Sequence, residues 1–512
     1  MKFAFLFLLW IYHLLVFSQE NDSLVVFSDL KYHSDFEKEA ISHYVQNKTD
    51  TLNLFLAIDS AMSIETALVY NKIFRTMIQE LHDKDIESMK IPKRVRRSFT
   101  ILHDNHLHKY NEIEFLPSLF EKGNYNCVTS SILYSMVFEE LKIPYKIQAT
   151  KNHVYLVANP GPNSIVVETT NPSIEKKEYL EDYKREYVSH LRSIKLISEK
   201  EYKTKSVNEI FEEKINNVWT AEFNNLIGFQ YYNLGLVKFS NKEVEESYKL
   251  FQKAYFFNSD KQVQLVLYGV LLQLVSTCKY EKVSDIDYIA QLSRYKEINF
   301  EFTKKLVLEI LEYHLQFTDR LALCDSIYDR FISQITNETN KEEMDFEFNL
   351  FMGKHLVKSK AQKKYVERLV NIRQNHREAN DLFVGYLEYS LKDVYDYEKQ
   401  LKAINEYRKS YPYNFVQKVL YEYELIAHLN EAQELLKYNY IEDGDIYLKK
   451  FENLAPEPID TENENLIKSI ENAYRALAIY YFYNETRQKA IDAINRGLKY
   501  VPGSRYLQTA VY

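Results

Sequence analysis

The sequence predicts a two-part fold, an α+β N-terminal domain followed by an all-α helical-repeat solenoid. Gly and Pro each occur only 10 times in 512 residues, which favours long helices over turn-rich β structure. Three runs rich in β-branched and aromatic residues lie between about residues 144 and 168, as expected of a small antiparallel sheet. From about Trp219 onward the apolar residues follow the spacing of paired helices.

The chain begins with a segment typical of a secretory signal peptide. A Lys is followed by an apolar run from Phe3 to Phe17 and by a small residue, Ser18, which is the order of regions in such signals. We expect residues 1–18 to be removed. The run is short for a membrane span, and no comparable run recurs. The mature chain is therefore expected to be exported, to the periplasm or secreted, without a membrane span.

The net charge and the number of cysteines exclude some classes of partner and of fold. The formal net charge is −8, which argues against a nucleic-acid partner. An exported chain with only Cys127, Cys278 and Cys324 is not built on disulfides. Cys278 and Cys324 lie in helical text and are expected in the core, although a bridge between them stays open. The histidine cluster at residues 103, 106 and 108 fits no metal-ligand spacing. No metal or cofactor is expected.

A nucleophile candidate opens a predicted helix. Residues from about Asp35 to Phe120 are mainly helical in pattern. Gly123, Asn124 and Asn126 are turn and cap residues, which places Cys127 in the first turn of the next helix. The helix dipole stabilises a thiolate there. One apolar stripe at helical spacing contains Ile132, Leu133, Met136, Val137 and Leu141.

A hairpin after this helix carries a candidate base and a candidate acid. The runs HVYLVA and SIVVET are separated by Asn159, Pro160, Gly161 and Pro162, a turn cluster. If the hairpin closes at Ala158 and Asn163, antiparallel register pairs His153 directly with Glu168. A thiol, an imidazole and a carboxylate are the parts of a nucleophilic acyl-transfer site.

The stretch from about Asn124 to Pro172 resembles the core of the transglutaminase-like cysteine-enzyme superfamily. The residues that carry the resemblance are Cys127, the helix end Leu141-Lys142-Ile143-Pro144, His153-Val154-Tyr155, and Glu168-Thr169-Thr170-Asn171-Pro172. The resemblance implies that Cys127 is the nucleophile, His153 the general base and acid, and Glu168 the residue that orients His153. A backbone N–H at the helix start would stabilise the oxyanion, with Asn124 and Asn126 as nearby candidates. Two positions depart from the family pattern: Glu168 replaces the usual Asp, and Tyr155 replaces the commoner Trp.

The C-terminal part resembles tetratricopeptide repeats. The copy nearest the C-terminus contains Tyr474, Leu477, Ala478, Tyr481, Ala490, Ile494, Gly497 and Pro502, and a second contains Tyr231, Leu234, Gly235, Ser247, Phe251 and Ala254. A weaker third contains Leu387, Ile404, Tyr407 and Lys409–Pro412. Residues from about 262 to 381 are helical but degenerate. We therefore expect a transglutaminase-like domain over 19–218, with its core at about 120–172, and a repeat domain over 219–512 without any sheet.

Two functions of different classes follow from these predictions. The first is an exported cysteine enzyme of transglutaminase-like type that acts on amide or peptide bonds, with hydrolysis favoured over acyl transfer, and that binds protein or peptide partners through its repeats. The second is a non-catalytic exported scaffold that binds peptides in the repeat groove and carries a silenced transglutaminase-like domain.

Overall fold

The structure is a computed structural model that describes residues 24–48, 50–150, 153–170, 188, 192, 198–207, 209–210, 219–296, 298–317, 320–392, 394 and 396–510. The expected signal peptide at 1–18, and most of the charged stretch from 173 to 217, lie outside these residues. The chain divides into two compact units. Unit 1 contains Met1–Glu281 and Asp287–Asn299, and unit 2 contains Lys282–Ile286 and Phe300–Tyr512.

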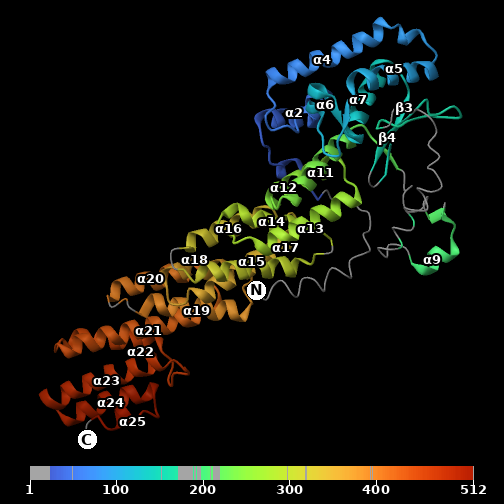
Figure 1. Cartoon of the computed structure of the whole chain (residues 1–512). Helices are drawn as coiled ribbons and strands as arrows, with labels where there is room; N and C mark the ends of the chain where they lie inside the picture. The colour runs from blue at the N-terminus through green and yellow to red at the C-terminus, as the bar shows by residue number, and fades with distance from the viewer. Residues whose placement is uncertain are drawn as a thin grey trace. The chain divides into compact units, whose positions relative to one another are not determined.

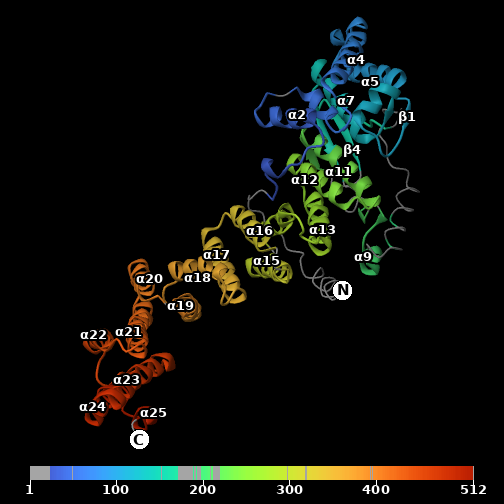
Figure 2. The ribbon, with the colours of Figure 1, turned by 90° about the vertical axis from the view of Figure 1, so that its left-hand side faces the viewer.

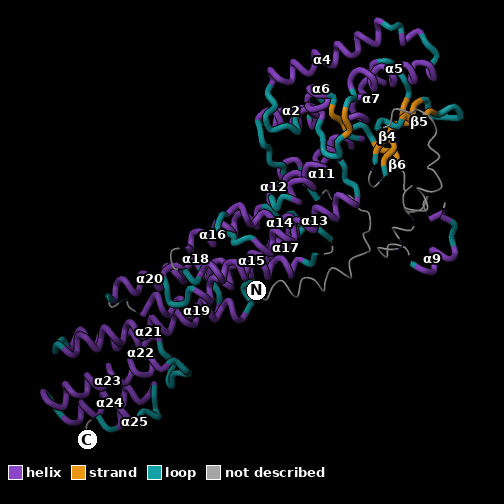
Figure 3. Tube along the Cα trace, viewed as in Figure 1, coloured by secondary structure: helices purple, strands orange, loops and turns teal. Residues whose placement is uncertain are grey.

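Unit 1 combines helices with two small sheets (Figures 1 and 3). Its helices are η2 (Phe27–Asp29), α2 (Asp35–Val45), α3 (Thr51–Leu56), α4 (Ile64–Asp83), η3 (Ile86–Ser88), α5 (Ile91–His106), α6 (Leu116–Lys122), α7 (Cys127–Glu140), α9 (Glu199–Thr204), α11 (Asn225–Ser240), α12 (Val244–Phe257), α13 (Lys261–Thr277) and α14 (Asp287–Leu292). Its strands are β1 (Lys109–Tyr110), β2 (Asn124–Tyr125), β3 (Tyr145–Ala149), β4 (Val154–Ala158), β5 (Ile165–Val167) and β6 (Trp219–Ala221).

Helix α7 is the centre of unit 1. Every residue from Val128 to Phe138 is buried, so the helix is covered on all sides and not only along the stripe that the sequence predicts. It packs against β3 and β4 on one side and against α6 and α11 elsewhere. A helix that is apolar all round needs such complete coverage. The thiol at its first residue is therefore carried by a helix that is buried over most of its length.

The larger sheet has the strand order β5-β4-β3-β6, and all neighbouring strands are antiparallel. Strands β3, β4 and β5 occupy the three runs that the sequence predicts. Strand β6 corrects the prediction that no sheet follows Trp219, because Trp219–Ala221 pairs with Ala149–Ile147 of β3. A strand of three residues depends on its partner for hydrogen bonds, and no local pattern reveals it. The helices begin only at Asn225.

The compact unit extends beyond the start of the paired helices. Gln230 of α11 accepts a hydrogen bond from the backbone N–H of Leu116 and donates one to the carbonyl of Phe55. Tyr231 donates to the carboxylate of Glu37 in α2 at 2.8 Å. These polar contacts are buried, so α11 completes the core around α7 as well as forming a helix pair with α12.

Unit 2 is all-helical within the described residues. Its elements are η4 (Val283–Ile286), α15 (Phe300–Leu315), α16 (Leu321–Ser333), α17 (Glu338–His355), η6 (Lys360–Gln362), α18 (Lys363–Ile372), α19 (Arg377–Lys392), α20 (Tyr397–Ser410), α21 (Asn414–Lys437), α22 (Ile441–Leu454), α23 (Glu464–Asn484), α24 (Arg487–Tyr500) and α25 (Arg505–Gln508). Helices that pack extensively from α15 onward are one or two positions apart along the chain, and Figures 1 and 2 show them side by side in chain order. This is the arrangement of a helical-repeat solenoid.

Small residues allow the paired helices to approach closely. A Cβ atom added at Gly497 of α24 would lie 2.8 Å from Cβ of Tyr474 in α23, and one added at Gly235 of α11 would lie 2.7 Å from the ring of Phe251 in α12. Both glycines are signature positions of the predicted repeats, and each of the three predicted copies falls on a helix pair, α11–α12, α19–α20 or α23–α24.

Among the described residues, no helix is both long and apolar enough to cross a bilayer.

Candidate active site

The helix that carries the thiol begins at Cys127 because Asn126 caps it. Oδ1 of Asn126 accepts hydrogen bonds from the backbone N–H groups of Val128 and Thr129 at 3.0 and 2.9 Å. The hydroxyl of Thr129 accepts the N–H of Asn126 in return, at 2.9 Å, which completes a reciprocal cap. Cys127 thus occupies the first helical position, as the sequence predicts, and its side chain is only partly buried.

His153 and Glu168 are in contact, but not through the predicted register. The observed pairs are Leu156 with Val167 and Ala158 with Ile165, so the predicted direct pairing of His153 with Glu168 is wrong by two residues. Because side chains alternate between the faces of a sheet, a shift of two keeps both groups on one face. They become diagonal neighbours, which a long side chain can bridge.

The side chain of Glu168 is long enough to reach His153 across this diagonal. Both carboxylate oxygens of Glu168 lie close to Nε2 of His153, at 3.0 and 2.9 Å. The Cys127 thiol lies close enough to the imidazole to contribute to the raised pKa of His153. The ring of Tyr155 stacks on the imidazole with centroids 6.0 Å apart. Cys127, His153 and Glu168 are therefore neighbours in space.

The charges of the three groups support one another. Burial opposes protonation of His153, but hydrogen bonds and negative charge from Cys127 and Glu168 outweigh burial and raise the pKa of His153 to about 10. Burial also opposes ionisation of Glu168, yet the hydrogen bonds and charge that it receives from His153 and Thr170 lower its pKa. At neutral pH the imidazole is therefore a cation between two acidic groups.

Threonine residues that the site prediction did not include hold the acid and the helix. The Thr170 hydroxyl donates to Oε1 of Glu168 at 2.7 Å, and its backbone N–H donates to the same oxygen at 3.3 Å. Ser130 of α7 donates to the buried Thr169 hydroxyl at 2.9 Å. The sequence signal for these contacts was the Glu-Thr-Thr run itself, since Ser and Thr near a carboxylate commonly make such local bonds.

Asn124 and Asn126, the two residues suggested near the oxyanion, already use their side-chain amides in other hydrogen bonds. Nδ2 of Asn126 donates to the carbonyls of Glu112 and Glu114, each at 3.1 Å, so both of its amide hydrogens are used. Nδ2 of Asn124 donates to Oε1 of Glu114 at 3.2 Å. In contrast, the backbone N–H of Cys127 has no acceptor among the described residues, as is usual in the first turn of a helix.

The surroundings of the remaining cysteines and of the histidine cluster indicate structural roles. Cys324 is fully buried in α16, and burial raises its pKa to about 11. No disulfide joins Cys127, Cys278 or Cys324. His106 pairs with Glu80 at 3.1 Å, whereas His103 stacks on Phe99. The described residues contain no group of three or more His, Cys, Asp or Glu side chains arranged to hold a metal.

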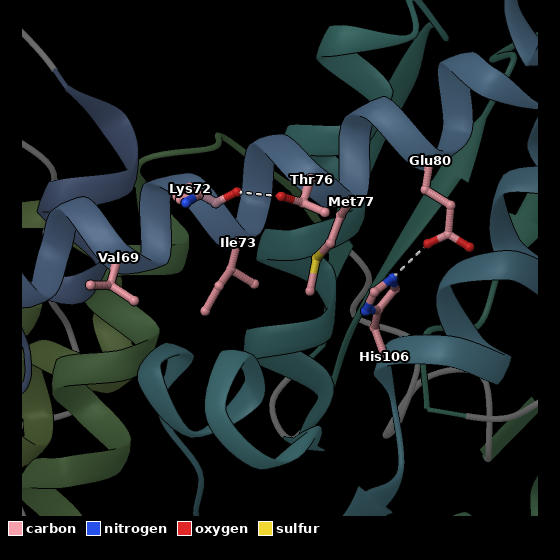
Figure 4. Close-up of a pocket in the computed structure, with 7 residues that line it drawn as sticks. All are labelled: Val69, Lys72, Ile73, Thr76, Met77, Glu80 and His106. Carbon is pink, nitrogen blue, oxygen red and sulfur yellow. Dashed lines mark hydrogen bonds and ion pairs between the residues drawn. The ribbon is translucent and has the colours of Figure 1, made fainter.

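Two hollows in unit 1 lie along α4 and not at the thiol. One has a volume of about 260 Å³ and is shown in Figure 4, where Val69, Ile73 and Met77 form its apolar wall and the His106–Glu80 pair closes one end. The other, of about 530 Å³, lies between α2 and α4 and is lined in part by Phe36 and Leu68. Cys127, His153 and Glu168 line neither hollow.

Comparisons with known proteins add little to this geometry. No protein-family model matches the chain, and no curated protein matches it in sequence. One solved structure, titled "Structure of Naa15/Naa10 bound to HypK-THB", aligns with 86% of this chain at 11% identity, and the aligned part spans 65% of that chain. Its TM-score is 0.15, which is too low to carry an argument about fold or function.

Proposed function

We propose that this protein is an exported cysteine enzyme of transglutaminase-like type that acts on amide or peptide bonds, with hydrolysis favoured over transfer to an amine. The observation that carries the proposal is the contact of His153 with Glu168 at 2.9 Å beside a thiol at a helix start. Such an arrangement would give the thiol a base and give that base an orienting acid.

The charges suggest how the steps would proceed. The Cys127 sulfur attacks the carbonyl carbon, and protonated His153 gives its proton to the leaving amine. The product is a thioester, which carries no charge on sulfur. One of the two negative neighbours that raise the pKa of His153 is then absent, so the ring can accept a proton from an attacking water. The N–H of Cys127, which has no acceptor among the described residues, would be the donor for the oxyanion in both steps.

The helix pairs suggest a second task within the same chain. A solenoid of stacked helix pairs presents an extended surface of the kind that binds peptides and proteins. We propose that unit 2 binds a protein partner or substrate. If the site is inactive, this surface is the function that remains, which is the scaffold alternative.

Thiol reactivity tests the proposal. Iodoacetamide labelling of the folded, reduced chain, followed by peptide-resolved mass spectrometry from pH 5 to 9, gives a rate for each cysteine. We expect Cys127 to react faster than Cys278 and Cys324, His153→Ala to remove much of that advantage, and Glu168→Gln to remove less because the acid only orients the base. Equal, slow labelling of all three cysteines, unchanged by His153→Ala, would favour the scaffold.

A further inference from the structure

The loop that precedes α6 is fastened to the start of the thiol helix through its backbone. Asn126 donates to the carbonyls of Glu112 and Glu114, and the N–H of Asn111 donates to the carbonyl of Tyr125 at 2.9 Å. Strand β1 pairs with β2 so that Tyr110 lies opposite Tyr125, two residues before Cys127. Backbone groups of residues 110, 111, 112 and 114 are therefore bound by residues 125 and 126, which directly precede Cys127.

The side chains of this loop face solvent. Tyr110 is 47% exposed and Ile113 is 55% exposed, and Glu112 is also exposed. The Tyr110 ring meets Tyr125 edge to face at 5.8 Å. Exposed aromatic and apolar side chains on a fixed loop beside a candidate nucleophile are typical of a substrate contact. We refer to Tyr110, Glu112 and Ile113 as the rim.

Among the described residues, negative charge around the rim is not balanced by positive charge. Burial raises the pKa of Tyr110, and the negative charges of Cys127, Glu112 and Glu168 raise it further, so these acidic groups all act on one phenol. Glu168 has a cationic partner in His153, and the Glu114 carboxylate accepts hydrogen bonds from Asn111 and Asn124. Lys109 precedes Tyr110 in β1 and points to the opposite face of the strand.

We propose that the rim binds a positively charged substrate side chain with an aliphatic stem, such as that of a lysine residue next to the bond that Cys127 attacks. The ammonium contacts the Tyr110 ring and the Glu112 carboxylate, and the stem lies along Ile113. A cation over an aromatic face and near a carboxylate is stabilised by both groups. This inference rests on the proposed function, because it assumes that Cys127 reacts with the bound substrate.

Matched electrophiles can test the rim. Acetyl-aminoacyl chloromethyl ketones with a lysine, a norleucine or a glutamate side chain differ mainly at the position that the rim would bind. The second-order rate of Cys127 alkylation by each, divided by the iodoacetamide rate of the same variant, separates recognition from thiol reactivity. We expect the lysine probe to exceed the norleucine probe by about 2- to 5-fold, as for an exposed cation–aromatic contact, and the glutamate probe to be slowest.

Variants assign the preference to its residues. Glu112→Gln and Tyr110→Leu should each reduce the lysine-to-norleucine ratio, whereas Tyr110→Phe should keep it because the ring remains. Glu140→Gln, an exposed position at the far end of α7, is the matched control and should change nothing. High salt should shrink the lysine advantage.

The two proposals fail in different ways. If iodoacetamide labels Cys127 no faster than Cys278 and Cys324, the enzyme proposal is overturned, and the rim inference falls with it. If Cys127 is the reactive thiol but all three probes react at equal normalised rates, or the ratio is unchanged by Glu112→Gln and Tyr110→Leu, the rim inference alone is overturned.

Discussion

The two units differ in the distance along the chain that their polar contacts span. In unit 1 several buried or partly buried contacts join residues that are far apart: Glu37 with Lys253 (216 residues), Gln230 with Phe55 (175) and Arg294 with Asp29 (265). In unit 2 they are about one helix pair apart: Lys364 with Asp325 (39 residues), Asn463 with Glu422 (41) and Arg496 with Glu452 (44).

The two units should therefore respond differently to a destabilising substitution. Unit 1 is closed by contacts between its beginning and its end, so losing one of them should weaken the whole unit, including the candidate site. Unit 2 is close to one-dimensional, and the effect of a change should fade over neighbouring helices.

The largest effect is expected at Glu37. This fully buried carboxylate contacts Lys253 at 2.5 Å, and the Lys253 side chain is 2% exposed. Glu37→Gln would leave a buried ammonium without its counter-charge, which typically costs about 3–5 kcal/mol. Hydrogen exchange in denaturant should show faster exchange throughout unit 1 and no change in α21–α24. Glu434→Gln, which breaks the exposed pair with Lys437, is the control. A loss confined to α2 and α12 would contradict the closed-unit view.

Glycine substitutions in unit 2 should have smaller and opposite effects. Gly497→Ala forces a Cβ against Tyr474 and should destabilise the C-terminal helices by about 1–3 kcal/mol. Gly385→Ala meets nothing within 4 Å and should stabilise α19 by up to about 1 kcal/mol through helix propensity. Exchange rates should change only in helices adjacent to each substitution. Propagation of the Gly497→Ala effect to α15 would argue against the one-dimensional description.

A change confined to the candidate site should leave both units folded. Glu168→Gln removes one of the negative groups that raise the pKa of His153 to about 10. The pKa of His153 should therefore fall toward its ordinary value, and the ring should lose its proton at lower pH than in the parent chain. NMR titration of ¹⁵N-labelled histidine would measure this, with Cys127→Ser as a second variant expected to lower it too. An unchanged midpoint would mean that the carboxylate does not control the ring.

The smallest effect is expected at Thr170. Thr170→Val removes the hydroxyl bond to Glu168 at 2.7 Å, while the backbone N–H and His153 still bind the carboxylate. One such bond contributes about 0.5–1.5 kcal/mol, so Cys127 labelling should slow less than with Glu168→Gln. Thr170→Ser should restore the parent rate. A loss as large as that of Glu168→Gln would show that the hydroxyl, and not the histidine, orients the acid.

The sequence predicted the face on which the site residues lie better than their register. Two strands separated by turn residues imply alternating faces, but turn residues alone do not fix the loop length. The hairpin closes between Ala158 and Ile165, and Gly161 at φ 141° lies in the loop between them. Because the error was an even number of residues, His153 and Glu168 stayed on one face.

Other features were beyond sequence reasoning for a physical reason. The buried partner of Glu37 lies 216 residues away, and no local pattern connects the two. Strand β6 exists only because β3 offers it a partner. The helix pairs, in contrast, were predictable because close contacts such as that of Gly497 with Tyr474 recur at short and regular separations.

The way in which Asn126 holds the neighbouring loop has a consequence for how this protein can change. Its side-chain amide donates to the backbone carbonyl oxygens of Glu112 and Glu114. Because every amino acid has a backbone carbonyl, these hydrogen bonds do not depend on which side chains stand at positions 112 and 113. Substitutions there can alter what approaches the thiol without loosening the helix cap. Substrate selectivity can thus change during evolution, or be altered with a library of variants at these two positions, while the nucleophile stays in place.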